Sequence, residues 1–176
     1  MDSSEGGWTV IQHRKRDNPR VNFNTTWDDY KRGFGDVNGN YWLGNDAIHT
    51  LTTAYNNSLF IRFKSTTNQS FEAQYSSFSL SDETGDYRLS LGNMSGNIVD
   101  AFRSWHPVVN HSFSTFDHDN THSRCPASRK SGWWFNDCTL VNLNAPFFEF
   151  HSDQVWDEII SSGKYLFSSE MLIRRM

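Results

Sequence analysis

The residues that decide the fold are LFIRFKSTTNQSFEAQY, at positions 59–75. Apolar side chains recur at every second position from Leu59 to Phe63 and again from Phe71 to Tyr75. This period of two is typical of a β-strand that buries one face. Because only a short polar segment separates the two runs, we predict that they pair as a hairpin.

Segments on either side of this hairpin predict further strands. They lie at Trp8–Gln12, Tyr87–Leu91 and Glu170–Arg174. Antiparallel strands with segregated short helices define the α+β class, which is the fold class we predict.

Two helices are predicted before residue 59. Thr26 is expected to cap the first helix, with Asp28 and Asp29 in the first turn, where the helix dipole favours negative charge. Asn45 is expected to cap the second helix. The apolar face of the second helix is predicted from helical spacing to contain Ala47, Ile48 and Leu51.

Residues 1–176 are predicted to form a single domain. Fourteen Phe and seven Trp can fill a core although the hydrophobic fraction is only 36%. Residues 1–91 would carry the sheet and the helices, and residues 92–176 a loop-rich calcium and ligand region with the final strand. Loop-like sequence as long as that from Gly92 to Asn144 is usually functional in a compact domain.

Charge and hydropathy argue against two kinds of partner. The formal net charge of −4 disfavours nucleic acid. No apolar run approaches the ~20 residues that a membrane span requires. The dense basic run His13–Arg16 is interpreted as a solvated face, with contact to an anionic glycan as the alternative.

The two cysteines, Cys125 and Cys138, bear on the cellular compartment. A disulfide between them would close a loop of about a dozen residues and stabilise the fold by ~3 kcal/mol. Reduced thiols in a cytosolic protein are the alternative. An exported protein is favoured by five N-glycosylation motifs, at Asn24, Asn56, Asn68, Asn93 and Asn110. Since the first twenty residues are polar and contain no signal peptide, the chain is interpreted as a fragment or as dependent on a segment not present here.

Catalytic motifs are absent from the sequence. It contains no GxSxG elbow, HExxH helix or phosphate-binding loop. We therefore predict that the protein is not an enzyme, and a hydrolase remains only a remote alternative.

Six short motifs occur in order along the chain. They are GGWTVIQ at residues 6–12, KRGFG at 31–35, YWLGN at 41–45, FST at 113–115, GWWFNDC at 132–138 and EM at 170–171. Together they resemble the fibrinogen-like C-terminal domain of ficolins, tachylectins, angiopoietins and tenascins. Members of that family usually carry a further N-terminal segment with a second disulfide, which this sequence lacks.

The resemblance implies a twisted antiparallel sheet flanked by short helices, with a long loop-rich binding region. It also implies a secreted module that catalyses nothing. Ficolins and tachylectins bind acetylated sugars, whereas angiopoietins, tenascins and fibrinogen bind proteins. We therefore expect acetylated glycans or an extracellular protein receptor as the partner, in innate immunity or adhesion. A protein–protein signalling or matrix ligand without lectin activity is the alternative, and a bare sheet edge would favour a homo-oligomer.

The family holds calcium in the loop before the first of these cysteines, with two carboxylates and backbone carbonyls. The corresponding residues here are Asp117, Asp119, Thr121 and Ser123. Thr121 stands where the second carboxylate is expected, and calcium affinity depends on ligand charge. We therefore expect calcium to bind weakly or not at all, the alternative being turn residues that hydrogen-bond their own backbone.

The acetyl-binding pocket of the family lies at the second cysteine. In the sugar-binding members the preceding peptide bond is cis, and here that bond joins Asp137 to Cys138. Thr139 replaces a family histidine, so the pocket walls differ. Ligand-binding residues are predicted at Arg129, Asp137, Cys138, Thr139, Phe147 and Gln154. Trp133 and Trp134 are interpreted as core, with a sugar-stacking platform as the alternative.

Four histidines lie within the same loop region, at positions 106, 111, 118 and 122. They are interpreted as solvated loop residues. Zinc binding by His118 and His122 with Asp117 or Asp119 is the alternative.

Overall fold

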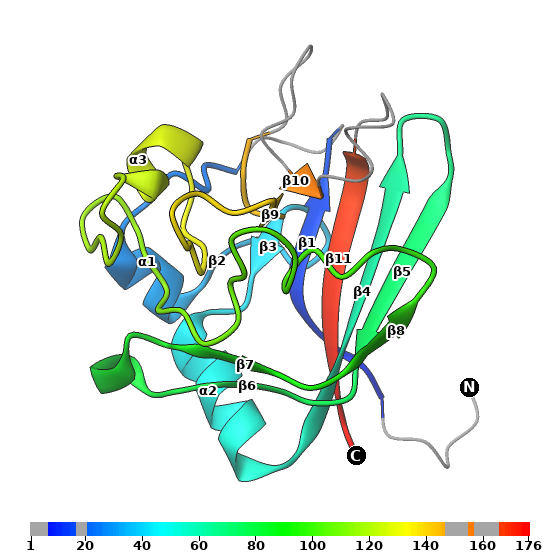
Figure 1. Cartoon of the computed structure of the whole chain (residues 1–176). Helices are drawn as coiled ribbons and strands as arrows, with labels where there is room; N and C mark the ends of the chain where they lie inside the picture. Colours follow the sequence, from blue (N-terminus) through cyan, green and yellow to red (C-terminus); the bar gives the residue numbers. More distant parts are fainter. Residues whose placement is uncertain (1–6, 17–20, 147–154, 157–165) are drawn as a thin grey trace.

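The computed structural model describes residues 7–16, 21–146, 155–156 and 166–176. Within these residues an antiparallel sheet carries short helices and irregular loops on one side (Figure 1). The helical elements are α1 (Trp27–Arg32), α2 (Asn45–Ala54), the 3₁₀ turn η1 (Glu83–Gly85) and α3 (Cys125–Arg129). This arrangement confirms the predicted α+β class. No helix of the described segments is long and apolar enough to cross a membrane.

Seven strands of the described residues form one sheet in the order β2-β3-β1-β11-β4-β5-β8, with every pairing antiparallel. They are β1 (Thr9–Lys15), β2 (Phe34–Gly35), β3 (Tyr41–Trp42), β4 (Asn57–Ser65), β5 (Ser70–Tyr75), β8 (Met94–Gly96) and β11 (Leu166–Arg175). Two smaller pairs join β6 (Phe78–Leu80) to β7 (Leu89–Leu91) and β9 (Val141–Asn142) to β10 (Val155–Trp156).

The predicted hairpin is confirmed as β4 and β5. Leu59 lies opposite Tyr75 and Phe63 opposite Phe71, so both apolar runs face the same side of the sheet. Leu59, Ile61 and Tyr75 are fully buried there. The period of two was therefore sufficient to predict both the pairing partners and the buried face.

The final strand is longer than predicted and lies at the centre of the sheet. β11 pairs with β1 on one side and with β4 on the other. The predicted strand Trp8–Gln12 is confirmed as β1, whose register shifts between Val10 and Gln12. Both Ile11 and Gln12 are buried, which strict alternation does not allow.

The strand predicted at Tyr87–Leu91 is wrong at its start. β7 begins at Leu89, whereas Tyr87 has a left-handed backbone with φ of 46° and is fully buried. The Tyr87 hydroxyl donates to Asp46 of α2, and its carbonyl accepts from Trp134 Nε1 at 2.8 Å. These contacts hold a bulky residue in a backbone region that it rarely adopts.

The basic run His13–Arg16 is not a uniformly solvated face, so that prediction is wrong for Arg14. The alternation of β1 turns Arg14 inward, where its guanidinium carbon lies 3.8 Å from the ring centroid of Phe23. Arg14 Nη1 donates to the carbonyl of Asn144 at 2.8 Å. Burial lowers the pKa of Arg14 to about 10, which still leaves the side chain charged near neutral pH.

The two predicted helices exist, but only the first has its predicted cap. Thr26 Oγ1 accepts from Asp29 N at 3.3 Å, as a capping residue should. In α2 the N-cap is Gly44, and Asn45 is instead buried, where it accepts from Trp42 Nε1 at 3.2 Å.

The predicted apolar face of α2 is confirmed for Ile48, which is buried, and is wrong for Leu51. Leu51 is 39% exposed, and the buried side contains Ile48 and Thr52. Thr52 fits there because its hydroxyl donates to the carbonyl of Ile48 at 2.8 Å and accepts from Leu80 N of β6 at 3.3 Å.

A buried tyrosine connects α1 to the loop region. The Tyr30 hydroxyl donates to the carbonyl of Phe23 at 2.7 Å and accepts from Gly132 N at 3.0 Å. Gly132 packs directly on this ring, since an added Cβ would lie 2.6 Å from Tyr30 Cε2 and 2.8 Å from Phe113 Cε1. Glycine is therefore the residue that fits at position 132.

Removing the Tyr30 hydroxyl should lower stability measurably. Tyr30→Phe leaves a buried donor and a buried acceptor without their partner, which costs about 2 kcal/mol. We expect the melting midpoint to fall by about 4–8 °C for a chain of this size. The control is Tyr41→Phe, since the half-buried Tyr41 has no side-chain hydrogen bond to a described residue. Equal midpoints for the two variants would contradict this role of Tyr30.

Candidate functional site

The loop region is built on a buried aromatic layer. Trp133 and Trp134 are fully buried, and their rings meet edge to face with centroids 5.0 Å apart. Phe135 is buried beside them. The interpretation of both tryptophans as core is therefore confirmed, and neither offers a stacking platform to a sugar. Their burial fixes the backbone from which residues 136–139 extend.

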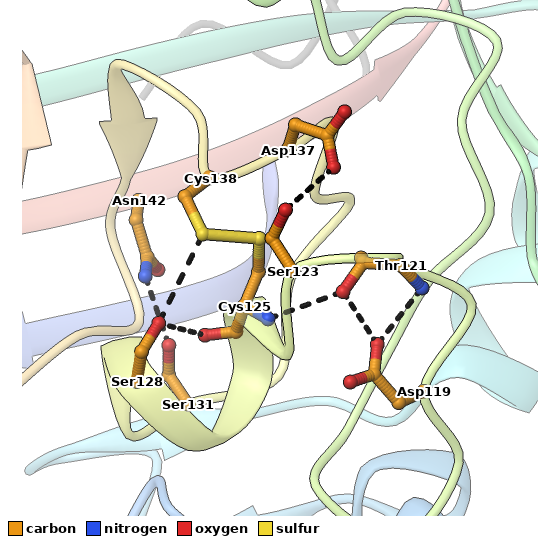
Figure 2. The surroundings of a disulfide bond; sticks show 9 residues. All are labelled: Asp119, Thr121, Ser123, Cys125, Ser128, Ser131, Asp137, Cys138 and Asn142. Carbon is orange, nitrogen blue, oxygen red and sulfur yellow. Dashed lines mark hydrogen bonds between the residues drawn. A yellow bond between two sulfur atoms is a disulfide. The ribbon is translucent and has the colours of Figure 1, made fainter.

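The disulfide predicted between Cys125 and Cys138 is present, with the two Cα atoms 5.2 Å apart. Figure 2 shows that it joins the start of α3 to the segment after Phe135. Cys125 is fully buried, whereas Cys138 is half-buried and so lies near the surface. The bond therefore holds a surface loop against a buried helix start.

Hydrogen bonds on both sides of the disulfide hold the same two segments together (Figure 2). Ser123 Oγ donates to Asp137 Oδ1 at 3.0 Å. Asn142 Nδ2 donates to Ser131 Oγ at 2.9 Å. We name the exposed face formed by residues 123–130 and 136–138 the disulfide surface.

The backbone of the disulfide surface departs from the family expectation. The peptide bond between Asp137 and Cys138 is trans, so a cis bond at this position is not what the structure shows. Both residues instead adopt left-handed φ angles, 41° for Asp137 and 62° for Cys138. The structure therefore lacks the cis bond that the family resemblance implied for acetyl binding.

Two basic residues flank α3 in the same strained conformation. Arg124 precedes the helix with φ of 52°, and Lys130 follows it with φ of 53°. Lys130 N donates to the carbonyl of Pro126, which closes the helix end. Glycine or asparagine is the usual choice at such positions, and another residue costs about 1 kcal/mol or more. Strain of this kind concentrates at functional sites.

The predicted ligand-binding residues fall into three groups. Asp137 is exposed, and Arg129 and Cys138 are half-buried, so the disulfide surface includes all three. Thr139 is buried, and its Oγ1 accepts from Val141 N at 3.0 Å, so its hydroxyl is not presented to solvent. Phe147 and Gln154 lie outside the described residues.

The predicted calcium ligands each make protein contacts instead. Asp117 Oδ1 accepts from Trp27 N at 2.9 Å and from Thr115 Oγ1 at 2.7 Å. Asp119 Oδ1 accepts from the amide and the hydroxyl of Thr121. The Ser123 hydroxyl bonds Asp137, as described above.

Thr121 takes part in the local hydrogen bonds of this loop. Its hydroxyl donates to Asp119 and accepts from Cys125 N at 3.1 Å, so it caps the start of α3 (Figure 2). The residue that replaces the expected second carboxylate therefore has a structural role. Within the described residues, no group of three or more His, Cys, Asp or Glu side chains could hold a metal ion.

The histidines do not gather into one site. The His118 ring stacks on Trp27 with centroids 4.0 Å apart, and its Nε2 lies 2.9 Å from Asp86 Oδ1. His111 Nδ1 lies 3.2 Å from the carbonyl of Val109. These contacts give His111 and His118 separate environments, and the part of the chain that the structure describes contains no group of three His, Cys, Asp or Glu side chains that could hold a metal ion.

A turn beside the disulfide surface was missed from the sequence. Trp105 at its tip is 82% exposed, the largest exposure among the large hydrophobic residues of the described segments. The turn is closed by Val108 N donating to the carbonyl of Phe102 at 2.9 Å. Asn136 Nδ2 donates to the carbonyl of Pro107 at 3.0 Å, which places the turn against the disulfide surface. A tryptophan in a stretch without strand or helix periodicity was the available signal.

These features define a class of protein. The chain is a disulfide-stabilised α+β domain in which loops on one side of an antiparallel sheet build an exposed, strained surface. The chain belongs to the fibrinogen C-terminal domain family, because the family model described as "Fibrinogen beta and gamma chains, C-terminal globular domain" matches residues 1–174. The resemblance stated from the sequence motifs is therefore confirmed.

Known proteins similar to this chain support the assignment. Human angiopoietin-4 is 39% identical over 182 residues, which cover 99% of this chain and 35% of that protein. The fibrinogen-like globe domain of human ANGPTL6 superposes with a TM-score of 0.88 at 36% identity, over 99% of this chain and 81% of that one. The lamprey fibrin D-dimer, complexed with the peptide Gly-His-Arg-Pro-amide, gives a TM-score of 0.88 at 29% identity, over 97% of this chain and 62% of that one. The chain thus spans about a third of angiopoietin-4.

Removing the disulfide should destabilise the domain. In the variant Cys125→Ser/Cys138→Ser the loop constraint is lost, which costs ~3 kcal/mol for a loop of this length. We expect the melting midpoint to fall by about 6–12 °C, measured by circular dichroism. Non-reducing peptide mapping of the parent should recover the two cysteines in one linked fragment. An unchanged midpoint, or two alkylatable thiols in the folded parent, would contradict the account.

Proposed function

We propose that the chain is an extracellular, non-catalytic recognition domain that binds a protein partner through the disulfide surface and the Trp105 turn. The observation that carries the proposal is the 82% exposure of Trp105 on a hydrogen-bonded turn. Tryptophan is enriched among the residues that dominate protein–protein affinity. A turn that is already ordered loses little conformational entropy on binding, which favours such a role.

The charge of this region supports a partner with an acidic surface. Arg124 and Lys130 are exposed, Arg129 is half-buried, and Asp137 is the single acidic residue of the disulfide surface. The whole chain has a formal charge of −4, whereas the disulfide surface carries a net positive charge. Complementary charge speeds encounter and favours the correct partner. The partner that fits best is a protein with acidic groups around an apolar pocket that accepts an indole ring.

The comparisons support a protein ligand more than a sugar. The lamprey fibrin structure is described as a peptide complex, and the similarity to angiopoietins implies protein signalling. The acetyl-binding features are altered here, since the Asp137–Cys138 bond is trans and Thr139 is buried. An acetylated glycan as ligand, with a place in innate immunity or adhesion, therefore takes second place.

Calcium and catalysis have no part in the proposal. The family resemblance predicts that calcium binding is weak or lost, and this stays a prediction. It is supported by the expected ligand oxygens, which form hydrogen bonds with protein groups. The absence of a catalytic motif from the sequence supports a domain that only binds. The disulfide supports an oxidising, extracellular location.

A binding screen tests the proposal. The full chain, immobilised, is titrated with a panel of purified receptor ectodomains and, separately, with N-acetylglucosamine. We expect saturable binding of at least one ectodomain, weakened at least about tenfold by Trp105→Ala because a central aromatic contact is lost. Val37→Ala is the matched control, since Val37 is 60% exposed in the connection between β2 and β3 and should leave binding unchanged.

Three results would contradict the proposal. One is an ectodomain that binds Trp105→Ala and the parent equally. Another is saturable binding of N-acetylglucosamine with no ectodomain bound, which would favour the lectin. The third is turnover on an ester or glycoside panel, abolished by a single carboxylate substitution, which would favour a hydrolase.

A further inference from the structure

We propose that five exposed asparagines are sites of N-linked glycosylation, and that the pairing of β11 with β4 closes one of them once the chain has folded. The five are Asn24, Asn56, Asn68, Asn93 and Asn110, each followed at the second position by Ser or Thr. The inference rests on the extracellular location proposed above and does not require the protein partner.

All five asparagines have the placement that glycosylation requires. Each is exposed, and each lies in a connection between elements rather than inside a helix or strand. None of the five side-chain amides is hydrogen-bonded to another described residue. A bulky, polar oligosaccharide is accommodated only at such positions.

The modification is a group transfer from a lipid-linked oligosaccharide pyrophosphate. The asparagine Nδ2 forms a bond to the anomeric carbon of the first sugar, and the bond from that carbon to the pyrophosphate oxygen breaks. The lipid pyrophosphate leaves with the bonding electron pair, and the amide gives up one proton to the medium. The enzyme recognises the hydroxyl at the second following position, so that hydroxyl must be accessible as well.

In the folded chain the hydroxyl of the Asn56 motif is inaccessible. It belongs to Ser58, which is 3% exposed in β4. Ser58 lies opposite Arg174 of β11, and its Oγ donates to the Arg174 carbonyl at 3.4 Å. These two residues are 116 positions apart, so Ser58 stays open during synthesis until the last strand has been made.

Asn68 provides an internal comparison at the other end of β4. It lies in the turn between β4 and β5, with φ of 60°, and the serine of its motif, Ser70, is exposed. The α2–β4 connection and the β4–β5 turn lie at opposite ends of β4 (Figure 1). The motifs of Asn56 and Asn68 both use serine, and folding covers the hydroxyl of Ser58 but leaves Ser70 exposed.

The positions of the motifs agree with the proposed binding surface. No Asn-X-Ser or Asn-X-Thr motif occurs between residues 111 and 176. The disulfide surface therefore carries no acceptor asparagine of its own. A glycan there would cover the residues that contact a partner.

Occupancy is tested on the full chain secreted from cultured animal cells behind a cleavable signal sequence. Peptide N-glycosidase converts each glycosylated asparagine to aspartate, and mass spectrometry of the peptides locates the change. We expect conversion at all five positions, abolished one at a time by the matching Asn→Gln variant. A secreted, folded chain without conversion at Asn56 or at Asn68 would overturn the assignment.

The closing of Asn56 is tested with unglycosylated chain produced in bacteria and refolded with its disulfide. The folded chain is incubated with microsomal oligosaccharyltransferase and its lipid-linked donor, and the comparison is the same chain synthesised behind a signal sequence by cell-free translation with microsomes. The chain that is modified during synthesis should be occupied to a similar extent at Asn56 and Asn68. The folded chain should be modified at Asn56 at least about tenfold less than at Asn68, because displacing a central strand requires nearly global unfolding.

Equal modification of Asn56 and Asn68 in the folded chain would overturn the role of β11. Both glycosylation tests are independent of the binding screen. A chain that binds no receptor but shows these modification patterns would refute only the proposed function.

Discussion

Strand β11 joins the last residues of the chain to both of its earlier halves. It pairs with β1 near the N-terminus and with β4 in the middle of the sequence, and its Met171 and Ile173 lie in the core. The central part of the sheet is therefore complete only when the final segment is in place, which makes its contacts strongly non-local. The helices and loops pack on the face that this strand completes. What the loops can present to a partner depends on that scaffold.

The loop region is stabilised mainly by interactions other than the backbone hydrogen bonds between paired strands. The Cys125–Cys138 disulfide, the buried pair Trp133 and Trp134, and the Tyr30 hydroxyl hold its backbone in place. Left-handed residues such as Lys130 persist only because the surroundings enforce them. Positions that break local conformational rules without an evident gain in stability are where function is expected. These left-handed residues lie on the disulfide surface, which is the surface proposed above for binding.

Much of the fold could be predicted from sequence because strand periodicity is a local signal. Alternation gave the β4–β5 hairpin and its buried face, and Thr26 was recognised as a cap from its neighbours. The burial of Arg14 could not be predicted, because a run of basic residues does not indicate which of its side chains points into the core. Burial of Thr52 in place of Leu51 depends on a contact with β6 that helical spacing does not reveal. The disulfide was predicted, whereas the exposure of Trp105 was not, because irregular loops have no period.

The central claim is that the disulfide fixes the backbone of the disulfide surface, while the sheet that β11 completes is stable without it. Amide hydrogen exchange, followed residue by residue before and after reduction and alkylation of the folded chain, tests it most directly. The account predicts faster exchange confined to residues 119–142, with β1, β4 and β11 still protected. Equal loss of protection across the sheet, or unchanged exchange in residues 119–142, would contradict it.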